Sequence, residues 1–111
     1  MAYDEDLAQR IRNLVAGGPD VTEKKMFGGL AFLVGGNMAV GASGEGGILV
    51  RVDPEETEAL VASTNAHVME MRGRSMRGWL RVDDEHLRSE DELERWVERG
   101  VAYARSLRAK P

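Results

Sequence analysis

The sequence predicts a single α+β domain in which helices pack on a mostly antiparallel sheet. Segments that alternate apolar and other residues follow one another directly and are separated by glycine-rich turns, as in β-hairpins. Amphipathic helical stripes lie near both ends of the chain, and a third helical segment interrupts the strands. The predicted order is α-β-β-β-α-β-β-α, with one domain over residues 1–111.

The first half of the chain is predicted to be a helix followed by a meander of strands. Residues 4–16 carry one apolar stripe at helical spacing, formed by Leu7, Ile11, Leu14 and Val15. Apolar alternation predicts three strands, at residues 30–34, 38–41 and 48–52. The glycines of "VGGN" and "SGEGG" suit the turns between them, because glycine adopts positive φ readily. The residues before Gly28 either extend the first of these strands or form a short separate one.

The second half is predicted to be a helix, a hairpin and a long final helix. Asp53 is a good N-cap before Pro54, so a helix is expected from there to about Ser63. The strands "HVMEM" and "GWLRV" are joined by "RGRSMR" as a hairpin loop. Ser89 and Glu92 have the spacing of a capping box, which predicts the start of the helix "SEDELERWVERGVAYARSL". We expect the first and last helices to cover one face of the sheet.

Composition narrows the class of protein. A chain of 111 residues that is 42% hydrophobic and 31% charged is typical of one soluble globular domain. No apolar run reaches the roughly 20 residues of a membrane helix, and "MAYDEDLAQR" does not resemble an export signal. Cysteine is absent, which excludes disulfides, a thiol nucleophile and a thiolate metal site. We therefore expect a bacterial cytoplasmic protein with no membrane partner.

The glycine-rich stretch "TEKKMFGGLAFLVGGNMAVG" does not fit a phosphate-binding loop. Such a loop lies between a strand and a helix and ends in Gly-Lys-Ser/Thr, whereas here the lysines precede the glycines and strands follow them. His67 and His86 have no neighbours at metal-ligand spacing, and no serine lies in a nucleophile motif. The acidic clusters lie at helix starts, where the helix dipole favours them. The sequence predicts no cofactor, no metal site, no catalytic residues and no enzymatic activity.

Two basic clusters with neighbouring aromatic residues are the candidate binding residues. They are Lys24, Lys25 and Phe27 in the first half, and Arg72, Arg74, Arg77 and Trp79 in the second. Arginine offers a planar fork for carboxylate or phosphate, and Gly73 and Gly78 allow close approach of a partner. The alternative is a solvated hairpin whose arginines pair with Glu70 and Asp83, with both aromatic side chains in the core. A net charge of −4 counts against general nucleic-acid binding.

The stretches "VTEKKMFGGLAFLVGGNMAVG", "ILVRVDPE", "MRGRSMRGWLRV" and "ERWVERGVAYARSL" together resemble the N-terminal domain of the TfoX/Sxy family. The most specific parts are residues 25–29 and 71–79, and the similarity runs over nearly the whole chain. The resemblance implies a fold similar to that of type III secretion chaperones. TfoX/Sxy proteins regulate natural competence together with a cAMP-responsive transcription activator. Those regulators carry a further C-terminal domain. The sequence stops at Pro111, just after its last predicted helix, so we expect a stand-alone N-terminal domain.

The function predicted from these observations is that of a small non-enzymatic interaction module. It is expected to bind an unidentified protein partner and to influence transcription indirectly. One alternative is direct nucleic-acid binding through the two basic clusters, and another is binding of a small anionic ligand between them. Because an open sheet leaves unpaired edges, a homodimer is a further alternative.

Overall fold

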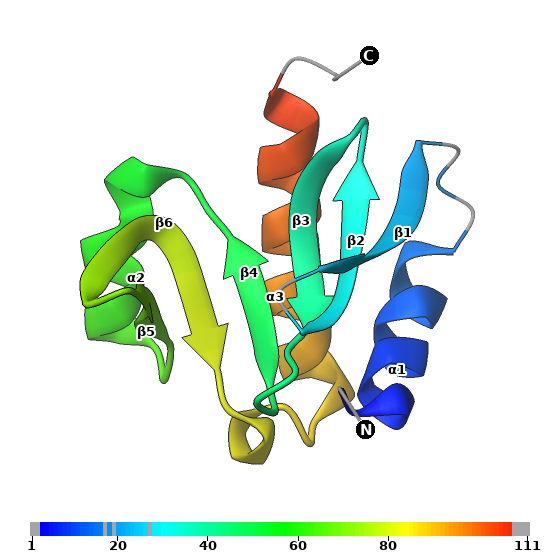
Figure 1. The fold of residues 1–111 in the computed structure, drawn as a ribbon, viewed down its shortest axis with the longest axis horizontal. Coiled ribbons are helices and arrows are strands. Elements are labelled where there is room, and N and C mark those ends of the chain that lie inside the picture. Colours follow the sequence, from blue (N-terminus) through cyan, green and yellow to red (C-terminus); the bar gives the residue numbers. More distant parts are fainter. Residues whose placement is uncertain (1–2, 17, 19, 27, 108–111) are drawn as a thin grey trace.

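The computed structural model describes residues 3–16, 18, 20–26 and 28–107, and it confirms the α+β class with an antiparallel sheet. Figure 1 shows the long C-terminal helix behind the central strands. The elements are α1 (Glu5–Val15), β1 (Val21–Met26), β2 (Gly29–Val34), β3 (Asn37–Ala42), β4 (Ile48–Arg51), the 3-10 helix η1 (Pro54–Glu56), α2 (Thr57–Ser63), β5 (His67–Met71), β6 (Arg74–Val82), the 3-10 helix η2 (Asp84–His86) and α3 (Glu90–Ser106). The predicted order is confirmed, and the residues before Gly28 form the separate strand β1.

The six strands lie side by side in the order β1-β2-β3-β4-β6-β5, and every neighbouring pair is antiparallel. The hairpin loop predicted over residues 72–77 is wrong in length, because β6 begins at Arg74. Arg72 and Gly73 both have positive φ, 54° and 78°, between the paired residues Met71 and Arg74. A two-residue turn of this kind matches the twist of the two strands, so the hairpin needs no longer loop.

The main hydrophobic core lies between one face of the sheet and the helices. As predicted, α1 and α3 pack on the same face, and α3 crosses behind β3 and β4 in Figure 1. Alternate residues of the central strands point into this core, and each is at most 6% exposed: Leu30, Phe32, Val34, Val40, Ala42, Ile48, Val50, Leu80 and Val82. The helices supply Leu7, Ile11, Leu93, Trp96 and Val97. This layer explains the period-two pattern of the strands.

The helix starts confirm the cap predicted at Asp53, contradict the capping box predicted at Ser89, and add an N-cap at Asp4. Asp4 accepts hydrogen bonds from the backbone N–H groups of Asp6 and Leu7, at 2.9 and 3.1 Å. Asp53 caps η1 by accepting from the N–H of Glu55 at 2.9 Å. Ser89 occupies the N-cap position of α3, but its side chain makes no cap hydrogen bond, so the predicted capping box is wrong. The acidic side chains of the first turn still suit the positive end of that helix.

A buried threonine ties η1 and α2 to strand β6. Thr57 is 1% exposed, and its hydroxyl oxygen accepts a hydrogen bond from the backbone N–H of Gly78 at 2.9 Å. Gly78 has φ +91°, and its carbonyl accepts from the N–H of Val52 at 2.8 Å. These hydrogen bonds give partners to the backbone N–H and carbonyl of Gly78, where β6 is irregular and lies beside the residues that lead into η1.

We expect Thr57→Val to lower the free energy of unfolding by about 1–3 kcal/mol, because the substitution leaves the buried N–H of Gly78 without its acceptor. Equilibrium urea unfolding measures this loss. Thr57→Ser keeps the hydroxyl, so it should recover most of the lost stability. Equal destabilisation by both substitutions would mean that the threonine acts through its methyl group instead.

Two arginines join the helices to the start of the sheet. Arg105 of α3 donates from Nη2 and Nε to the carboxylate of Asp20, at 3.1 and 3.3 Å. Arg12 of α1 donates from Nε and Nη2 to Glu23 of β1, at 2.6 and 2.8 Å. These hydrogen bonds hold the pKa values of Asp20 and Glu23 below their ordinary values. Both pairs fasten the edge strand β1 and its entry to the helical layer.

Stability is therefore expected to depend on acid through the Asp20–Arg105 pair. A carboxylate whose folded-state pKa is lowered contributes stability above its unfolded value of about 3.9, and this contribution is lost as the pH falls through the lower folded value. In Arg105→Gln, the urea midpoint should fall less between about pH 5 and pH 3 than in the unaltered protein. Parallel pH profiles for the two proteins would contradict this role.

Candidate functional site

The second face of the sheet is apolar, and no described helix packs on it. We call this side the open face. Its apolar residues all come from strands: Met26, Ala31, Leu33, Met38, Leu49, Met69 and Trp79. Figure 1 is viewed from this side, with α3 behind the strands. The sheet therefore has one face inside the helical core and one apolar face turned outward.

The centre of the open face has a buried floor and a half-buried rim. Ala31, Met38 and Leu49 are at most 7% exposed, because side chains from neighbouring strands close over them. Met26 of β1 and Met69 of β5 line the same hollow, although these strands are the two outer strands of the sheet. The sheet is therefore curved, with the open face on its concave side. The hollow measures about 50 Å³, which is room for a few water molecules or part of one side chain.

An arginine and a tryptophan lie on the same face beside this hollow. Arg51 of β4 is directly opposite Trp79 of β6, and its guanidinium carbon lies 5.2 Å from the centre of the indole ring. The same carbon is 5.7 Å from the ring centre of Tyr103 on α3. Arg51 thus stacks between an aromatic side chain of the open face and one of the helical layer, which restrains both arginine and tryptophan.

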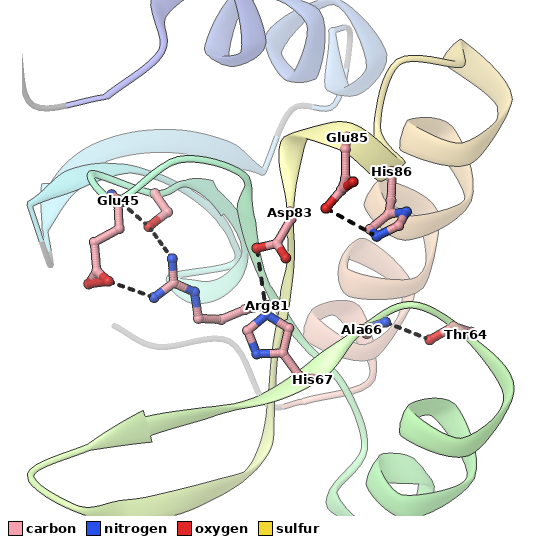
Figure 2. Close-up of polar contacts among 9 residues, drawn as sticks. Glu45, Thr64, Ala66, His67, Arg81, Asp83, Glu85 and His86 are labelled. Carbon is pink, nitrogen blue, oxygen red and sulfur yellow. Dashed lines mark hydrogen bonds and ion pairs between the residues drawn. The ribbon is translucent and has the colours of Figure 1, made fainter.

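A second arginine forms one wall of the hollow. Arg81 of β6 has a side chain only 21% exposed, and Figure 2 shows it directed toward Glu45 in the turn after β3. Its Nη1 donates to Glu45 Oε1 at 3.0 Å, and its Nη2 to the hydroxyl oxygen of Ser43 at 3.4 Å. His67 of β5 is directly opposite Arg81, and its Nε2 lies 3.6 Å from Asp83 Oδ1. The polar end of the hollow is thus made by Arg81 with the turn that holds Glu45.

The sequence of this domain matches one known protein-family model over most of its length. The model of the TfoX N-terminal domain matches residues 13–104. The chain belongs to the TfoX N-terminal domain family. A search of curated proteins found no match. The resemblance inferred from the sequence motifs is therefore confirmed at the level of the family.

In this TfoX N-terminal domain the sequence-predicted binding residues do not form one patch. Lys24 and Lys25 lie on the outer strand β1, and three strands separate them from Arg74, Arg77 and Trp79 on β6. Trp79 belongs to the open face. Lys24 is two residues from Met26 along β1, so it lies on the open-face side of that strand. Arg74 is two residues from Met76, which is paired with Met69 of the open face, so Arg74 lies on this side as well. Phe27 lies outside the described residues.

The remaining predicted residues are directed elsewhere. Lys25 alternates with Lys24 along β1, so it is on the helical side of that strand. Arg72 lies in the exposed hairpin turn. Arg77 is on the helical side, where its Nη2 is 3.1 Å from Glu58 Oε1 of α2. The hydrogen bond from Arg77 holds the pKa of Glu58 below its ordinary value. Arg77 is thus occupied by a carboxylate of the protein itself, though not by Glu70 or Asp83.

Sequence reasoning from charge missed most of the open face. It did not single out Met26, Leu33, Leu49, Arg51 or Arg81 as one surface. The signal that could have found them is the double apolar pattern of "GLAFLV" and "NMAVGA", since a strand that is apolar on both sides has two faces to cover. Arg51 in "LVRV" and Arg81 in "WLRV" each lie between an apolar residue and a valine, and this repeated pattern indicates both arginines.

Within residues 3–16, 18, 20–26 and 28–107, no group of three or more His, Asp or Glu side chains could hold a metal ion. His86 Nε2 is 3.8 Å from Glu85 Oε1 beside α3, away from His67 in Figure 2. None of the described helices is long and apolar enough to cross a membrane.

Proposed function

We propose that this TfoX N-terminal domain is a non-enzymatic interaction module that binds a protein partner through the open face of its sheet. The observation that carries the proposal is the concave apolar face, whose floor is buried and whose rim is half exposed. Apolar surface that remains outside the core is a common mark of a protein-binding site. An indirect influence on transcription is the role we propose for such binding, in line with the regulators that the family is named for.

The chemistry of the face supports a protein partner over a metabolite. Methionine side chains are unbranched and polarizable, so Met26, Met38 and Met69 can adapt to an inserted side chain. Tryptophan and arginine are frequent energetic centres of interfaces, and Trp79 and Arg51 are already stacked together. Sites for small molecules usually measure about 300–1,000 Å³, several times the hollow described here.

Photo-cross-linking followed by affinity measurement tests the proposal. A photoreactive amino acid is placed at Leu33 on the open face and, as the control, at Ala102 on the exposed side of α3, and partners cross-linked in the native host are identified. We expect a partner that cross-links from position 33 and not from position 102. The partner is then purified, and its Kd is measured by calorimetry.

Substitutions decide whether the identified partner uses the open face. Leu33→Glu introduces charge at its half-buried rim and should weaken the affinity by about tenfold or more. Ala102→Glu introduces the same charge on α3 and should leave the affinity unchanged. Equal cross-linking from both positions, or an affinity unaffected by Leu33→Glu, would overturn the assignment of the open face.

Direct nucleic-acid binding is a second candidate because basic residues gather on the strands. The strands carry Lys24, Lys25, Arg51, Arg74, Arg77 and Arg81, against the carboxylates Glu23 and Glu70. Titration into labelled duplex DNA at low and near-physiological salt tests this function, since phosphate contacts weaken steeply with salt. Salt-sensitive binding that Arg74→Ala and Arg81→Met both reduce would favour it. Absence of binding at low salt would exclude it.

A further inference from the structure

The distribution of charge indicates what kind of protein segment the open face accepts. The chain as a whole has a net charge of −4, but its strands carry six basic residues and two acidic ones. Four of the basic residues lie on the open-face side of their strands by alternation and register: Lys24, Arg51, Arg74 and Arg81. A face that is apolar and basic complements an apolar segment with carboxylates beside it. A second copy of the chain would bring like charges together on this face.

Arg81 is the basic residue that lines the hollow of the open face. Its side chain lines the hollow together with Leu49 and Met69, and only 21% of it is exposed. Its position is fixed by strand β6, where it is paired with Leu49 on one side and His67 on the other. A guanidinium has five N–H donors in a planar fork, so Arg81 can hold a carboxylate by two parallel bonds beside an apolar side chain.

Glu45 occupies part of this fork from within the protein. Its carboxylate accepts from Arg81 at 3.0 Å, but 77% of the Glu45 side chain is exposed (Figure 2). Glu45 lies in the turn between β3 and β4, next to Gly46 and Gly47 with φ of +95° and +69°. Because the Glu45 side chain is mostly exposed, its contact with Arg81 contributes little to stability, so another carboxylate can replace Glu45 without loss of the fold.

We infer that the open face accepts an acidic segment of the partner, with an apolar side chain in the methionine-lined hollow and a carboxylate on Arg81, and that Glu45 is the internal competitor for that arginine. This inference rests on the proposed function and adds the chemistry of the partner and a built-in restraint on its binding. Glu45 keeps the guanidinium oriented while the face is empty. The partner's carboxylate then takes the same donors.

A phage-displayed library of random linear peptides, selected on the purified protein, supplies the probe. We expect the selected peptides to share an apolar residue flanked by Asp or Glu. The strongest binder is synthesised with a fluorescent label, together with a matched peptide in which each carboxylate is replaced by its amide. Fluorescence anisotropy should give at least tenfold weaker binding of the amide peptide, because hydrogen bonds from a guanidinium to a carboxylate are stronger than those to a neutral amide.

Variants of the protein test the roles of the two side chains. Arg81→Met keeps an apolar stem and should weaken the acidic peptide about tenfold or more. Glu45→Gln removes the competitor and should strengthen it about two- to fivefold. Glu58→Gln is the matched control, because it releases Arg77 from an exposed ion pair on the opposite side of β6. It should leave the affinity unchanged. Glu45 and Glu58 are both exposed, so these variants report on binding even if Arg81→Met unfolds.

The possible outcomes separate this inference from the proposed function. Peptides whose binding depends on Leu33 but not on Glu45 or on their own carboxylates would overturn the inference and leave the protein-binding function standing. Absence of any peptide whose binding Leu33→Glu weakens would overturn both. A dimer that forms with rising concentration and is abolished by Leu33→Glu would identify a second copy as the occupant and overturn the inference. DNA binding that depends on Arg81 would overturn it in favour of a nucleic acid.

Discussion

Phe32→Ala is expected to lower the free energy of unfolding by about 3–5 kcal/mol, the range for removing a buried aromatic side chain from a core. Phe32 is 1% exposed and lies at the centre of β2, on the side that faces the helices. The truncation leaves a cavity between the sheet and the helical layer, and neighbouring side chains can refill it only in part. Urea unfolding followed by circular dichroism measures the loss.

The neighbouring residue Leu33 provides the control, because it points to the opposite face. Leu33 is half-buried on the open face, so Leu33→Ala should cost about 1 kcal/mol, well below the cost of a fully buried leucine. The two adjacent substitutions therefore have very different expected effects. Comparable losses at both positions would mean that the open face is packed as tightly as the core.

Gly100→Ala is expected to lower the free energy of unfolding by about 2 kcal/mol, although alanine favours a helix by about 1 kcal/mol at an exposed site. A Cβ at position 100 would lie 2.4 Å from the carbonyl oxygen of Ala39. The register of β2 and β3 passes from Phe32–Val40 to Leu33–Met38, so Ala39 is the extra residue of a bulge. Gly100 lets α3 approach the backbone at this point.

Thermal and urea unfolding of Gly100→Ala give the sign of the effect directly. A stabilised variant would show that α3 can move away from β3 without loss of packing, so the close approach would carry no energetic weight. The loss should be larger in Gly100→Val, because the branched side chain adds bulk at the same contact and disfavours the helix.

Most of the fold could be predicted from local patterns. The helical stripe from Leu7 to Val15 and the alternation around Val50 and Leu80 reflect the single core that these residues share. The sequence does not decide whether strand β1 is separate, because its central residues are polar and carry no alternation. They are exposed in the structure, as is common for an outer strand. The early start of β6 at Arg74 was missed because a two-residue turn with Arg72 at positive φ leaves little trace in the sequence.

The candidate site was less accessible to sequence reasoning because it is made by register. Arg51 and Trp79 lie far apart along the chain, and only the pairing of β4 with β6 places them opposite each other. Charge alone makes Lys24 and Arg74 candidate binding residues, but the strand order places them far apart across the sheet. Trp79 is close in sequence to the arginine cluster, but only the pairing of β6 with β4 places it beside Arg51 on the concave face.

The separation of charge between strands and the rest of the chain has a consequence for the kinetics of encounter. The acidic partner inferred above would be repelled by the predominantly acidic remainder of the molecule and attracted toward the basic strands. The electric field would then orient the two proteins toward the open face before they touch. Raising the ionic strength should therefore slow association while leaving dissociation nearly unchanged, since screening acts mainly on the approach. The charges on the strands would then set the association rate, and the contacts of the open face would set the dissociation rate.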